Sequence, residues 1–548
     1  MDLRGGTLRT GGPTNALVGG EPFTNLNYMA GFGTIIGGGA FNTNGPGFDK
    51  AILNLGTIVA QGGVNGGTLI IDTGVSTLSN GIANFGTMIV ATTNDTLVLR
   101  RQAETGAVTN NNFIINTGTI LINGGTLTAN TAITNQFLGA SLPGLIQGFG
   151  TIALTNQLVN LGTIRSTTNT VTGGEGVLRF VNPVGSALQI SQSGTVVVEN
   201  ASQMIFGSDG NAPLLNNGTI VMNGGTLVSG VLTNSSGARF AGFGMITSSI
   251  INSGTGLATS LSSSLHLTGA TVFNQTNGVL GANNGRLMVD TVFTNAGTVS
   301  FINSVGTFSS AVVNRGAWVM DPSTNVFMAD YTVATNGYLS MTSGDVSIFK
   351  GNFVNVSTLS NQYNTLNGKF VMDGQGTQQF YVAGLNLGGF ASSQQPSNEI
   401  FFTNGSGTFS TNSFVLGKDD SIFGYSNNFA LGTFELSGLS TTVLMDSFGT
   451  VGSNDGLVAG LYLNTLTLDP GSLLIISSNV ELYFQTTNGV TGIGLGTLGA
   501  GDNVLILGGG SFHQLTVVPE PSILMLLSIG AFAIIGYRRR KARIQSKR

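Results

Sequence analysis

The sequence predicts an all-β fold, an elongated parallel β-helix or β-solenoid, with a short C-terminal transmembrane helix. Gly fills 84 of 548 positions and only 8% of residues are charged, yet 41% are hydrophobic, which is enough apolar surface to build a core. Short motifs recur through the first 320 residues, as in repeat proteins. An apolar run near the C-terminus ends in a basic cluster. These three observations carry the prediction.

Three motif forms make up the repeats. They are Asn-x-Gly-Thr-Ile at 54–58, 116–120, 160–164 and 216–220; Gly-Phe-Gly-x-Ile at 31–35, 148–152 and 242–246; and Asn-Gly-Gly-Thr-Leu at 65–69, 123–127 and 223–227. Each places a Gly-containing corner before a short apolar run. In such a run, Ile120 and Ile122 fall on one face because side chains alternate along a strand.

Strands this short are not stable alone, so we expect them to stack coil on coil about 4.8 Å apart. Inward Ile, Leu and Val then form one core, while Asn and Thr can stack in ladders. We expect Asn and Gly to take the positive φ of the tight corners. A right-handed solenoid with roughly 22 residues per coil fits residues 1–320.

Residues 321–507 carry longer strand-like stretches and more Phe and Tyr. They predict either an irregular continuation of the solenoid or a β-rich cap, with a separate β-sandwich as the alternative. Residues 508–518 are predicted to be a linker. The Gly-x-Gly-Thr-Ile and Asn-x-Gly-Thr-Ile units over about 300 residues resemble the passenger repeats of autotransporter adhesins.

The C-terminal segment has three parts in order. Val518, Pro519, Glu520, Pro521 and Ser522 precede an apolar run at 523–537, and Arg538, Arg539, Arg540 and Lys541 follow it. Fifteen residues are short for a membrane span, which needs about 20, so snorkelling arginines would help to complete it. The basic residues favour the cytoplasmic side, which places 542–548 in the cytoplasm and the body outside.

This order and spacing resemble the PEP-CTERM sorting signal, over residues 519–541. The resemblance implies an exosortase-type membrane protease that cuts near the Val-Pro-Glu-Pro motif and passes the protein outward. It also implies a bacterial protein of the cell envelope, transiently anchored in the membrane and then at the surface or outside the cell. An ordinary anchor that is never cut is the alternative.

The sequence starts at Met1 without an apolar signal peptide, and Gly5-Gly6-Thr7-Leu8 matches the third motif. We therefore expect this start to lie inside the repeat array, through a misplaced start or a gene fragment. Further repeats and a signal peptide encoded upstream would support that expectation.

Charge and composition exclude several function classes. Seven of the 20 basic residues lie in the last eleven positions, so the body is acidic, which argues against nucleic acid as a partner. Cysteine is absent, which excludes disulfides and thiolate chemistry. His266 and His513 are too far apart for a local metal motif, and His266 sits at an outward strand position. We predict no cofactor, no metal site and no catalytic residue.

Because parallel β-helices include polysaccharide lyases and hydrolases, a polysaccharide-active enzyme with the same tail is the alternative function. Such an enzyme needs clustered acidic and basic residues on one face. Asp419 and Asp420 form the only adjacent acidic pair, and Arg100, Arg101 and Glu104 fit a solvated loop. The leading expectation is therefore a structural or adhesin-like surface or extracellular-matrix protein, with exopolysaccharide or matrix proteins as partners.

Overall fold

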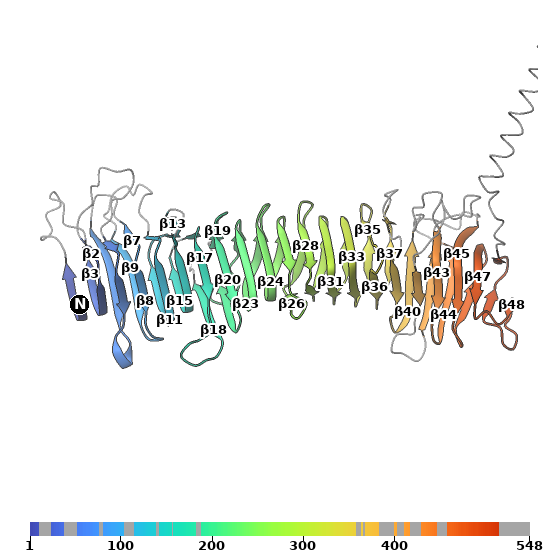
Figure 1. The fold of residues 1–548 in the computed structure, drawn as a ribbon, viewed down its shortest axis with the longest axis horizontal. Coiled ribbons are helices and arrows are strands. Elements are labelled where there is room, and N and C mark those ends of the chain that lie inside the picture. Colours follow the sequence, from blue (N-terminus) through green and yellow to red (C-terminus); the bar gives the residue numbers. More distant parts are fainter. Residues whose placement is uncertain are drawn as a thin grey trace, which may run out of the picture.

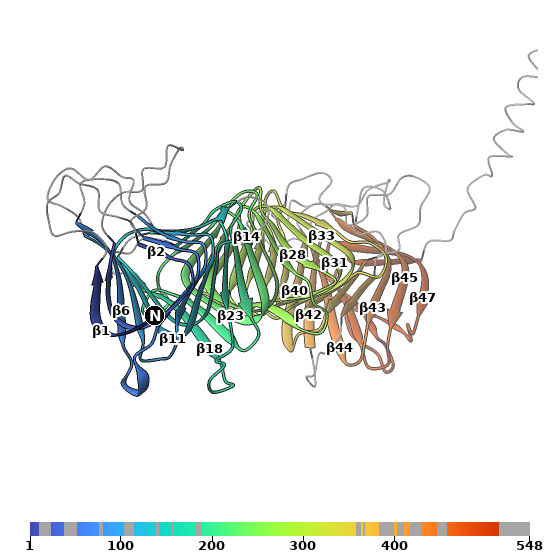
Figure 2. The same cartoon turned by 60° about the vertical axis from the view of Figure 1, so that its left-hand side comes forward.

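A computed structural model of the chain describes residues 1–9, 23–37, 52–75, 81–102, 114–138, 142–155, 157–181, 188–357, 363–364, 368–382, 399–402, 410–416, 429–446 and 458–514. The described strands wind into a long rod (Figure 1). Figure 2, turned toward one end, shows the coils following one another around a common interior. The all-β, parallel solenoid predicted from the sequence is therefore confirmed, whereas the predicted span at 523–537 lies outside the described residues.

Three stacks of parallel strands, here called stacks 1, 2 and 3, run along the first two thirds of the rod. Stack 1 holds β2 (Phe23–Asn25), β4 (Ile52–Asn54), β7 (Ile82–Asn84), β10 (Ile114–Asn116), β12 (Ile133–Asn135), β16 (Leu158–Asn160), β19 (Leu188–Ile190), β22 (Leu214–Asn216), β27 (Thr271–Asn274), β30 (Val292–Asn295), β32 (Val312–Asn314), β34 (Tyr331–Val333) and β37 (Phe353–Asn355). Stack 2 holds β5 (Thr57–Ala60), β8 (Thr87–Val90), β17 (Thr163–Ser166), β20 (Thr195–Glu199), β25 (Thr255–Ala258), β28 (Val279–Asn283), β35 (Tyr338–Ser340) and β38 (Tyr363–Asn364). Stack 3 holds β6 (Thr68–Val75), β9 (Thr96–Gln102), β18 (Gly176–Val181), β21 (Ser202–Phe206), β26 (Ser264–Leu267), β29 (Arg286–Val289), β36 (Val346–Phe349), β39 (Lys369–Met372) and β41 (Glu399–Phe402).

Longer strands turn a corner and belong to more than one stack. They are β1 (Asp2–Arg9), β3 (Tyr28–Ile36), β11 (Thr119–Ala129), β15 (Leu145–Leu154), β23 (Thr219–Asn234), β24 (Arg239–Asn252), β31 (Thr298–Phe308) and β33 (Ala317–Phe327). A 3-10 turn, η1 (Gly63–Asn65), connects β5 to β6. Within the described residues, β13 (Phe137–Leu138) and β14 (Leu142–Pro143) form the one antiparallel pair.

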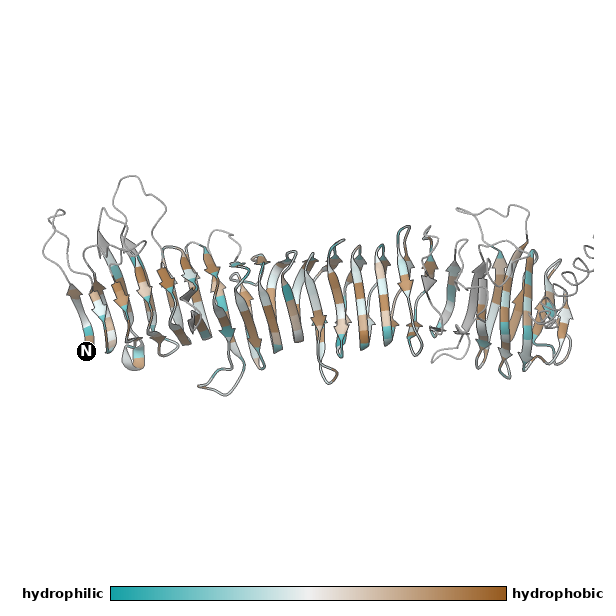
Figure 3. Ribbon diagram, turned by 45° about the horizontal axis from the view of Figure 1, so that its top comes forward, coloured by the Kyte–Doolittle hydropathy of each residue, from teal (hydrophilic) through white to brown (hydrophobic). Residues whose placement is uncertain are grey.

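The interior is a continuous apolar column along the rod. Ile120 and Ile122 of β11 are fully buried, as their period of two predicted, while Thr119 and Leu121 face outward and are partly exposed. Figure 3 shows apolar residues spread along the whole rod rather than gathered at one end. One core thus serves many coils, as expected for a solenoid.

Most strands of stack 1 end in a buried Asn, which in several coils is the Asn of the first motif. Its Nδ2 donates one hydrogen bond to Oδ1 of the Asn in the next coil, at 2.7–2.8 Å, and usually another to a main-chain carbonyl of stack 2. The expected Asn ladder is thus confirmed. It runs as two series of six residues: Asn25, Asn54, Asn84, Asn116, Asn135 and Asn160, then Asn216, Asn234, Asn252, Asn274, Asn295 and Asn314.

Apolar residues interrupt the ladder. Ile190 stands between Asn160 and Asn216, and Val333 stands between Asn314 and Asn355. Successive ladder partners are 18 to 32 residues apart in sequence, so coil length varies more than the predicted 22 residues imply.

The Gly of the first motif corrects the prediction of a positive φ. Gly86 and Gly118 do not adopt left-handed φ values. A Cβ at Gly86 would lie 2.1 Å from the carbonyl oxygen of Gly56, and one at Gly118 would lie 2.1 Å from that of Gly86. Close approach of successive coils, rather than backbone twist, requires Gly at this corner. Positive φ occurs instead in the other two motifs, for example at +128° for Gly148 and +95° for Gly124, where the prediction is confirmed.

Beyond β37 the strands continue to pair in parallel. β40 (Gly376–Val382), β42 (Ser410–Leu416), β44 (Ser440–Asp446), β46 (Leu473–Ile476) and β49 (Val504–Ile506) follow one another; beside them lie β43 (Phe429–Leu436), β45 (Ala459–Leu468), β47 (Val480–Asn488) and β50 (Ser511–Gln514), and β48 (Ile493–Leu495) pairs with β49. No described strand of this region forms a sandwich-like antiparallel pair. The predicted boundary at residue 320 falls inside β33, and β50 lies within the segment predicted as a linker.

Buried aromatic residues fill the interior from β30 to β40. Neighbouring ring centroids lie 4.4 to 6.1 Å apart. The members of this aromatic column are Phe293, Phe301, Phe308, Trp318, Phe327, Tyr331, Phe349, Phe353, Phe370 and Phe380. The rise in Phe and Tyr noted in the sequence is thus a change in what packs the core.

Candidate functional site

His266 takes part in a described cluster that combines an acid, a base and a hydroxyl. Its Nε2 lies 2.5 Å from Oδ2 of Asp290, and Ser309 Oγ donates to Oδ1 of Asp290 at 2.7 Å. His266 is at an outward position of β26, as predicted. Partial burial acts to raise the pKa of Asp290, but the hydrogen bonds from Ser309 and His266 and the charge of His266 lower it below its ordinary value.

The order of contacts in this cluster does not activate a nucleophile. A serine nucleophile donates to the base that removes its proton, and the acid holds the other side of that base. Here Asp290 lies between the two, so Ser309 donates to the carboxylate rather than to His266. The arrangement is that of a surface hydrogen-bond network linking successive coils.

Arg100 corrects a second expectation. It was expected in a solvated loop, but it lies in β9 and its guanidinium donates to Oδ2 of Asp72 in the neighbouring coil, at 2.6 and 2.8 Å. Asp72 is fully buried, while the Arg100 side chain is 40% exposed. Because a buried carboxylate needs a partner, this pair is explained by coil stacking. Glu104, Asp419 and Asp420 lie outside the described residues.

Other carboxylates are also satisfied by the fold. Asp95 accepts hydrogen bonds from the N–H groups of Gly62 and Gly67, at 2.8 and 2.9 Å, and thereby holds the turn that contains η1. Asp345 accepts from the N–H groups of Ser323 and Thr342, yet burial raises the pKa of its carboxyl, and nearby Asp321 adds to that effect.

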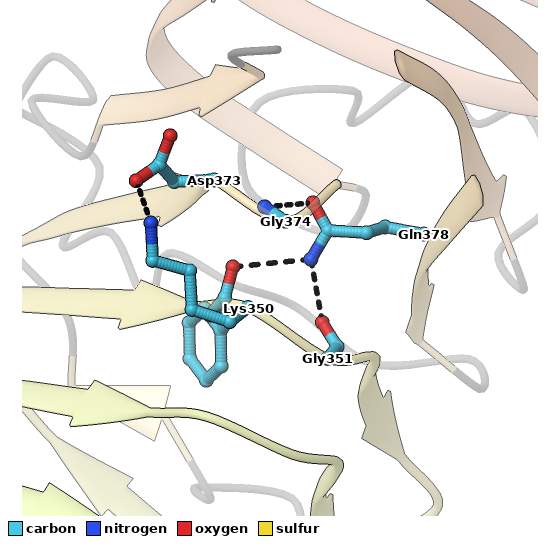
Figure 4. A network of polar contacts seen from close by, with 6 residues as sticks. Lys350, Gly351, Asp373, Gly374 and Gln378 are labelled. Carbon is cyan, nitrogen blue, oxygen red and sulfur yellow. Dashed lines mark hydrogen bonds and ion pairs between the residues drawn. The ribbon is translucent and has the colours of Figure 1, made fainter. Parts of the chain in front are cut away.

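A corner near β40 shows the same use of polar groups (Figure 4). Gln378 is buried; its Nε2 donates to the carbonyls of Phe349 and Gly351, at 3.0 and 2.7 Å, and its Oε1 accepts from Gly374 N–H at 2.7 Å. Lys350 and Asp373 form an ion pair beside it. Sequence reasoning missed Gln378, because nothing in its local pattern marks it as a corner residue.

Within the described residues, no group of three or more His, Cys, Asp or Glu side chains could hold a metal ion. No helix in that part of the chain is long and apolar enough to cross a membrane. Val518, Pro519, Glu520, Pro521 and Ser522, and the basic residues Arg538, Arg539, Arg540 and Lys541, all lie outside the described residues. Their predicted roles as sorting motif and cytoplasmic anchor stay predictions.

Comparison with known families decides the nature of the C-terminal segment. Residues 517–541 match the PEP-CTERM protein-sorting motif. This segment marks the chain as an exported protein that is sorted to the cell surface, and it implies processing by an exosortase, a membrane protease. The sorting motif predicted at residues 519–541 is thus confirmed.

Comparisons of the whole chain add little. No curated protein matches it. Among solved structures, a crystal structure of the TibC-catalyzed hyper-glycosylated TibA55-350 fragment aligns with 83% of this chain and 99% of that chain, at 11% identity and a TM-score of 0.15. Such a score carries no argument, so the resemblance to autotransporter passengers stays a prediction.

Proposed function

We propose that the chain is a bacterial surface or extracellular-matrix protein with a structural or adhesin-like role, sorted by its C-terminal tail. The match of residues 517–541 to the sorting motif is the observation that carries this proposal. The rod supports it, because a solenoid spaces its surfaces along one axis and offers an extended face for repeated contacts.

The tail works in two steps in this proposal. The apolar run at 523–537 holds the chain in the membrane while Arg538 to Lys541 keep the following residues in the cytoplasm. The exosortase then cuts near Val518 to Ser522 and the body leaves the membrane. Exopolysaccharide or matrix proteins are the proposed partners outside.

The body acts without enzymatic chemistry in this proposal. Several described carboxylates are engaged in coil-to-coil contacts, as for Asp72, Asp95 and Asp345. A lyase or hydrolase would need such groups turned toward a substrate groove.

Mass spectrometry of the C-terminal peptide, in membrane and released fractions of the native host, tests the sorting proposal. A mature chain that ends near Val518 to Ser522 and lacks Arg538 to Arg548 is the expected result. A variant with Pro519, Glu520 and Pro521 changed to Ala should stay uncut and membrane-bound. An intact tail on the wild-type chain, confined to membranes, would make the protein a plain anchored one.

A further inference from the structure

The Thr of the Asn-x-Gly-Thr-Ile motif is not explained by the interior of the rod. The Asn side chain belongs to the buried ladder, the Gly permits close coil contact, and the Ile is buried in the core. The Thr side chain points outward from stack 2. Threonine is favoured in β-strands. Its repeated placement on the outer surface, however, also calls for a role in contacts with other molecules.

These threonines, together with Thr87 and Thr195 at the equivalent position of other coils, form rows along the rod. Thr57, Thr87 and Thr119 are direct partners in successive coils, and so are Thr163, Thr195 and Thr219. Neighbouring strands are about 4.8 Å apart, so the hydroxyls recur at that spacing. All six side chains are partly exposed, and none of their hydroxyls bonds to another described residue.

A second row, two residues further along each strand, is largely aliphatic. It lies about 6.6 Å from the Thr row, which is the rise of two strand residues. Its exposed or partly exposed aliphatic members include Ile89, Leu121, Val221 and Leu257. Val59 and Val197 occupy the same row but are buried, and the polar residues Gln147 and Arg165 lie between Leu121 and Val197. The face therefore carries a row of hydroxyl groups beside a row of hydrocarbon, with interruptions at Leu145 and Arg165.

Charge is nearly absent from these two rows. From Thr57 to Ser300, the described positions include two charged residues, Arg165 and Arg239, and no carboxylate. A polyanion such as nucleic acid or an acidic polysaccharide would need many cationic contacts. A neutral ligand does not need such cationic contacts in order to bind.

We propose that the threonine and aliphatic rows of stack 2 bind a neutral polysaccharide chain that lies along the rod. Its hydroxyls would exchange hydrogen bonds with the Thr row, and the C–H faces of its rings would pack on the aliphatic row. The length of one sugar in an extended polysaccharide is comparable to the spacing between neighbouring coils. The same contact can therefore repeat from coil to coil, and many weak contacts together give useful affinity. The inference rests on the proposed export to the surface, where such polymers occur.

The test uses the full chain, kept in mild detergent because of the apolar run at 523–537. Its binding to cellulose, laminarin and dextran, three neutral polymers of different linkage, is compared with binding to the polyanion alginate. We expect retention on at least one neutral polymer, little changed by salt. The variant T163V/T195V/T219V should bind roughly tenfold more weakly, because three hydroxyls are lost while the β-branched shape is kept.

Two matched variants sharpen the test. T163S/T195S/T219S keeps the hydroxyls and should retain most of the binding. T96V/T126V/T151V removes three hydroxyls from a row on stack 3, where these residues are also partners in successive coils, and should bind like the wild type. Circular dichroism confirms that each variant is folded.

Several results would overturn the inference. They are failure of the wild type on all three neutral polymers, binding to alginate alone that salt abolishes, and equal losses in the stack 2 and stack 3 variants. Self-association that the stack 2 variant abolishes, without polymer binding, would assign the face to a second copy, and thermal hysteresis without polymer binding would assign it to ice. None of these results affects tail cleavage, so failure here is distinguishable from failure of the sorting proposal.

Discussion

The two parts of the rod hold their coils together by different means. From β2 to β32, a ladder of buried Asn amides links coil to coil above an interior made mainly of Ile, Leu and Val. The ladder stops after β32, and stacked aromatic rings fill the interior from β30 to β40. Asn355 lies beyond the break at Val333, and its Nδ2 has no partner among the described residues.

The difference shows that register and bulk stabilisation can come from separate parts of a coil. An amide ladder is directional, because each Nδ2 must meet the next Oδ1, so a slip of one residue would leave buried donors unpaired. Aromatic stacking stabilises by area and tolerates several ring geometries. Breaking each device in turn should therefore give different losses.

Replacing Trp318 by Ala should have the largest effect. Trp318 is fully buried and packs against Phe308, Phe327 and Tyr331, with centroids 5.1 to 5.5 Å away. We expect the free energy of unfolding to fall by about 4 kcal/mol through the cavity left behind. Urea unfolding followed by circular dichroism measures it, with hydrogen exchange of β33 to show where the loss lies.

Two variants control the Trp318 experiment. Phe273→Ala removes an outward ring that is about a third exposed, and should cost much less. Trp318→Phe should also cost less than Trp318→Ala, because the phenyl ring leaves a smaller cavity. Both substitutions remove the buried Nε1–H, which has no partner among the described residues. Equal losses for Trp318→Ala and Phe273→Ala would show that the aromatic column does not stabilise the core.

Asn216→Ala tests the ladder and should come next. Asn216 Nδ2 donates to Asn234 Oδ1 at 2.7 Å and to the carbonyl of Arg239 at 3.0 Å, and both acceptors are left without that donor. We expect a loss of about 2 kcal/mol. The adjacent Asn217 is the matched control, because it is partly exposed and outside the ladder. If Asn217→Ala costs as much, the ladder is not what holds these coils.

The sequence revealed the fold class and the periodic core because both are local patterns. Ile120 and Ile122 alternate with outward residues within one strand, and each motif repeats often enough to be recognised. The ladder was foreseen only in outline, since a sequence does not say which Asn meets which. The sorting tail was also readable, because its three parts are contiguous and match the known motif.

Contacts between coils could not be predicted. His266 and Asp290 are 24 residues apart, Arg100 and Asp72 are 28 apart, and Gln378 and Gly351 are 27 apart. Coil length varies, so no fixed spacing identifies such neighbours from sequence. The positive φ expected of the first-motif Gly was wrong for the same reason, because the neighbour of Gly118 is the carbonyl of Gly86 in another coil.

Ile190→Asn should join the two halves of the ladder. Ile190 is aligned with Asn160 on one side and Asn216 on the other, so an amide there can accept from the first and donate to the second. Its second N–H can reach the carbonyl of Thr219, by analogy with Asn160 and the Thr195 carbonyl. Three bonds of about 1 kcal/mol each, against roughly 2 kcal/mol of lost apolar burial, predict a gain of about 1 kcal/mol.

Ile190→Ala is the control for that gain. It removes the same apolar contact without supplying an amide, and we expect it to cost about 3 kcal/mol. Denaturant midpoints of the two variants are compared with the wild type. If Ile190→Asn destabilises the protein as much as Ile190→Ala, amide continuity does not contribute measurably at this coil.

The smallest expected effect is the pH dependence of Asp290→Asn. Because the pKa of Asp290 is lowered in the folded protein, its contribution to stability is present above the unfolded pKa, near 4, and is lost as the pH falls through the lower folded pKa. The side chain is 40% exposed, so solvent screening limits the contribution to about 0.3 kcal/mol. Asp290→Asn should thus differ from the wild type at pH 6 and approach it below pH 3.

Asp345, beside the aromatic column, should show the opposite sign. Burial raises its pKa in the folded protein, so the protonated form favours folding, and its contribution grows as the pH falls through the raised folded pKa toward the unfolded value. Denaturant midpoints between pH 3 and 7 for Asp290→Asn and Asp345→Asn should therefore diverge from the wild type in opposite directions. If the denaturant midpoints of both variants shift in the same direction relative to the wild type, folding lowers or raises the pKa of both carboxyl groups alike. The contrast between the two regions would then not extend to their charged groups.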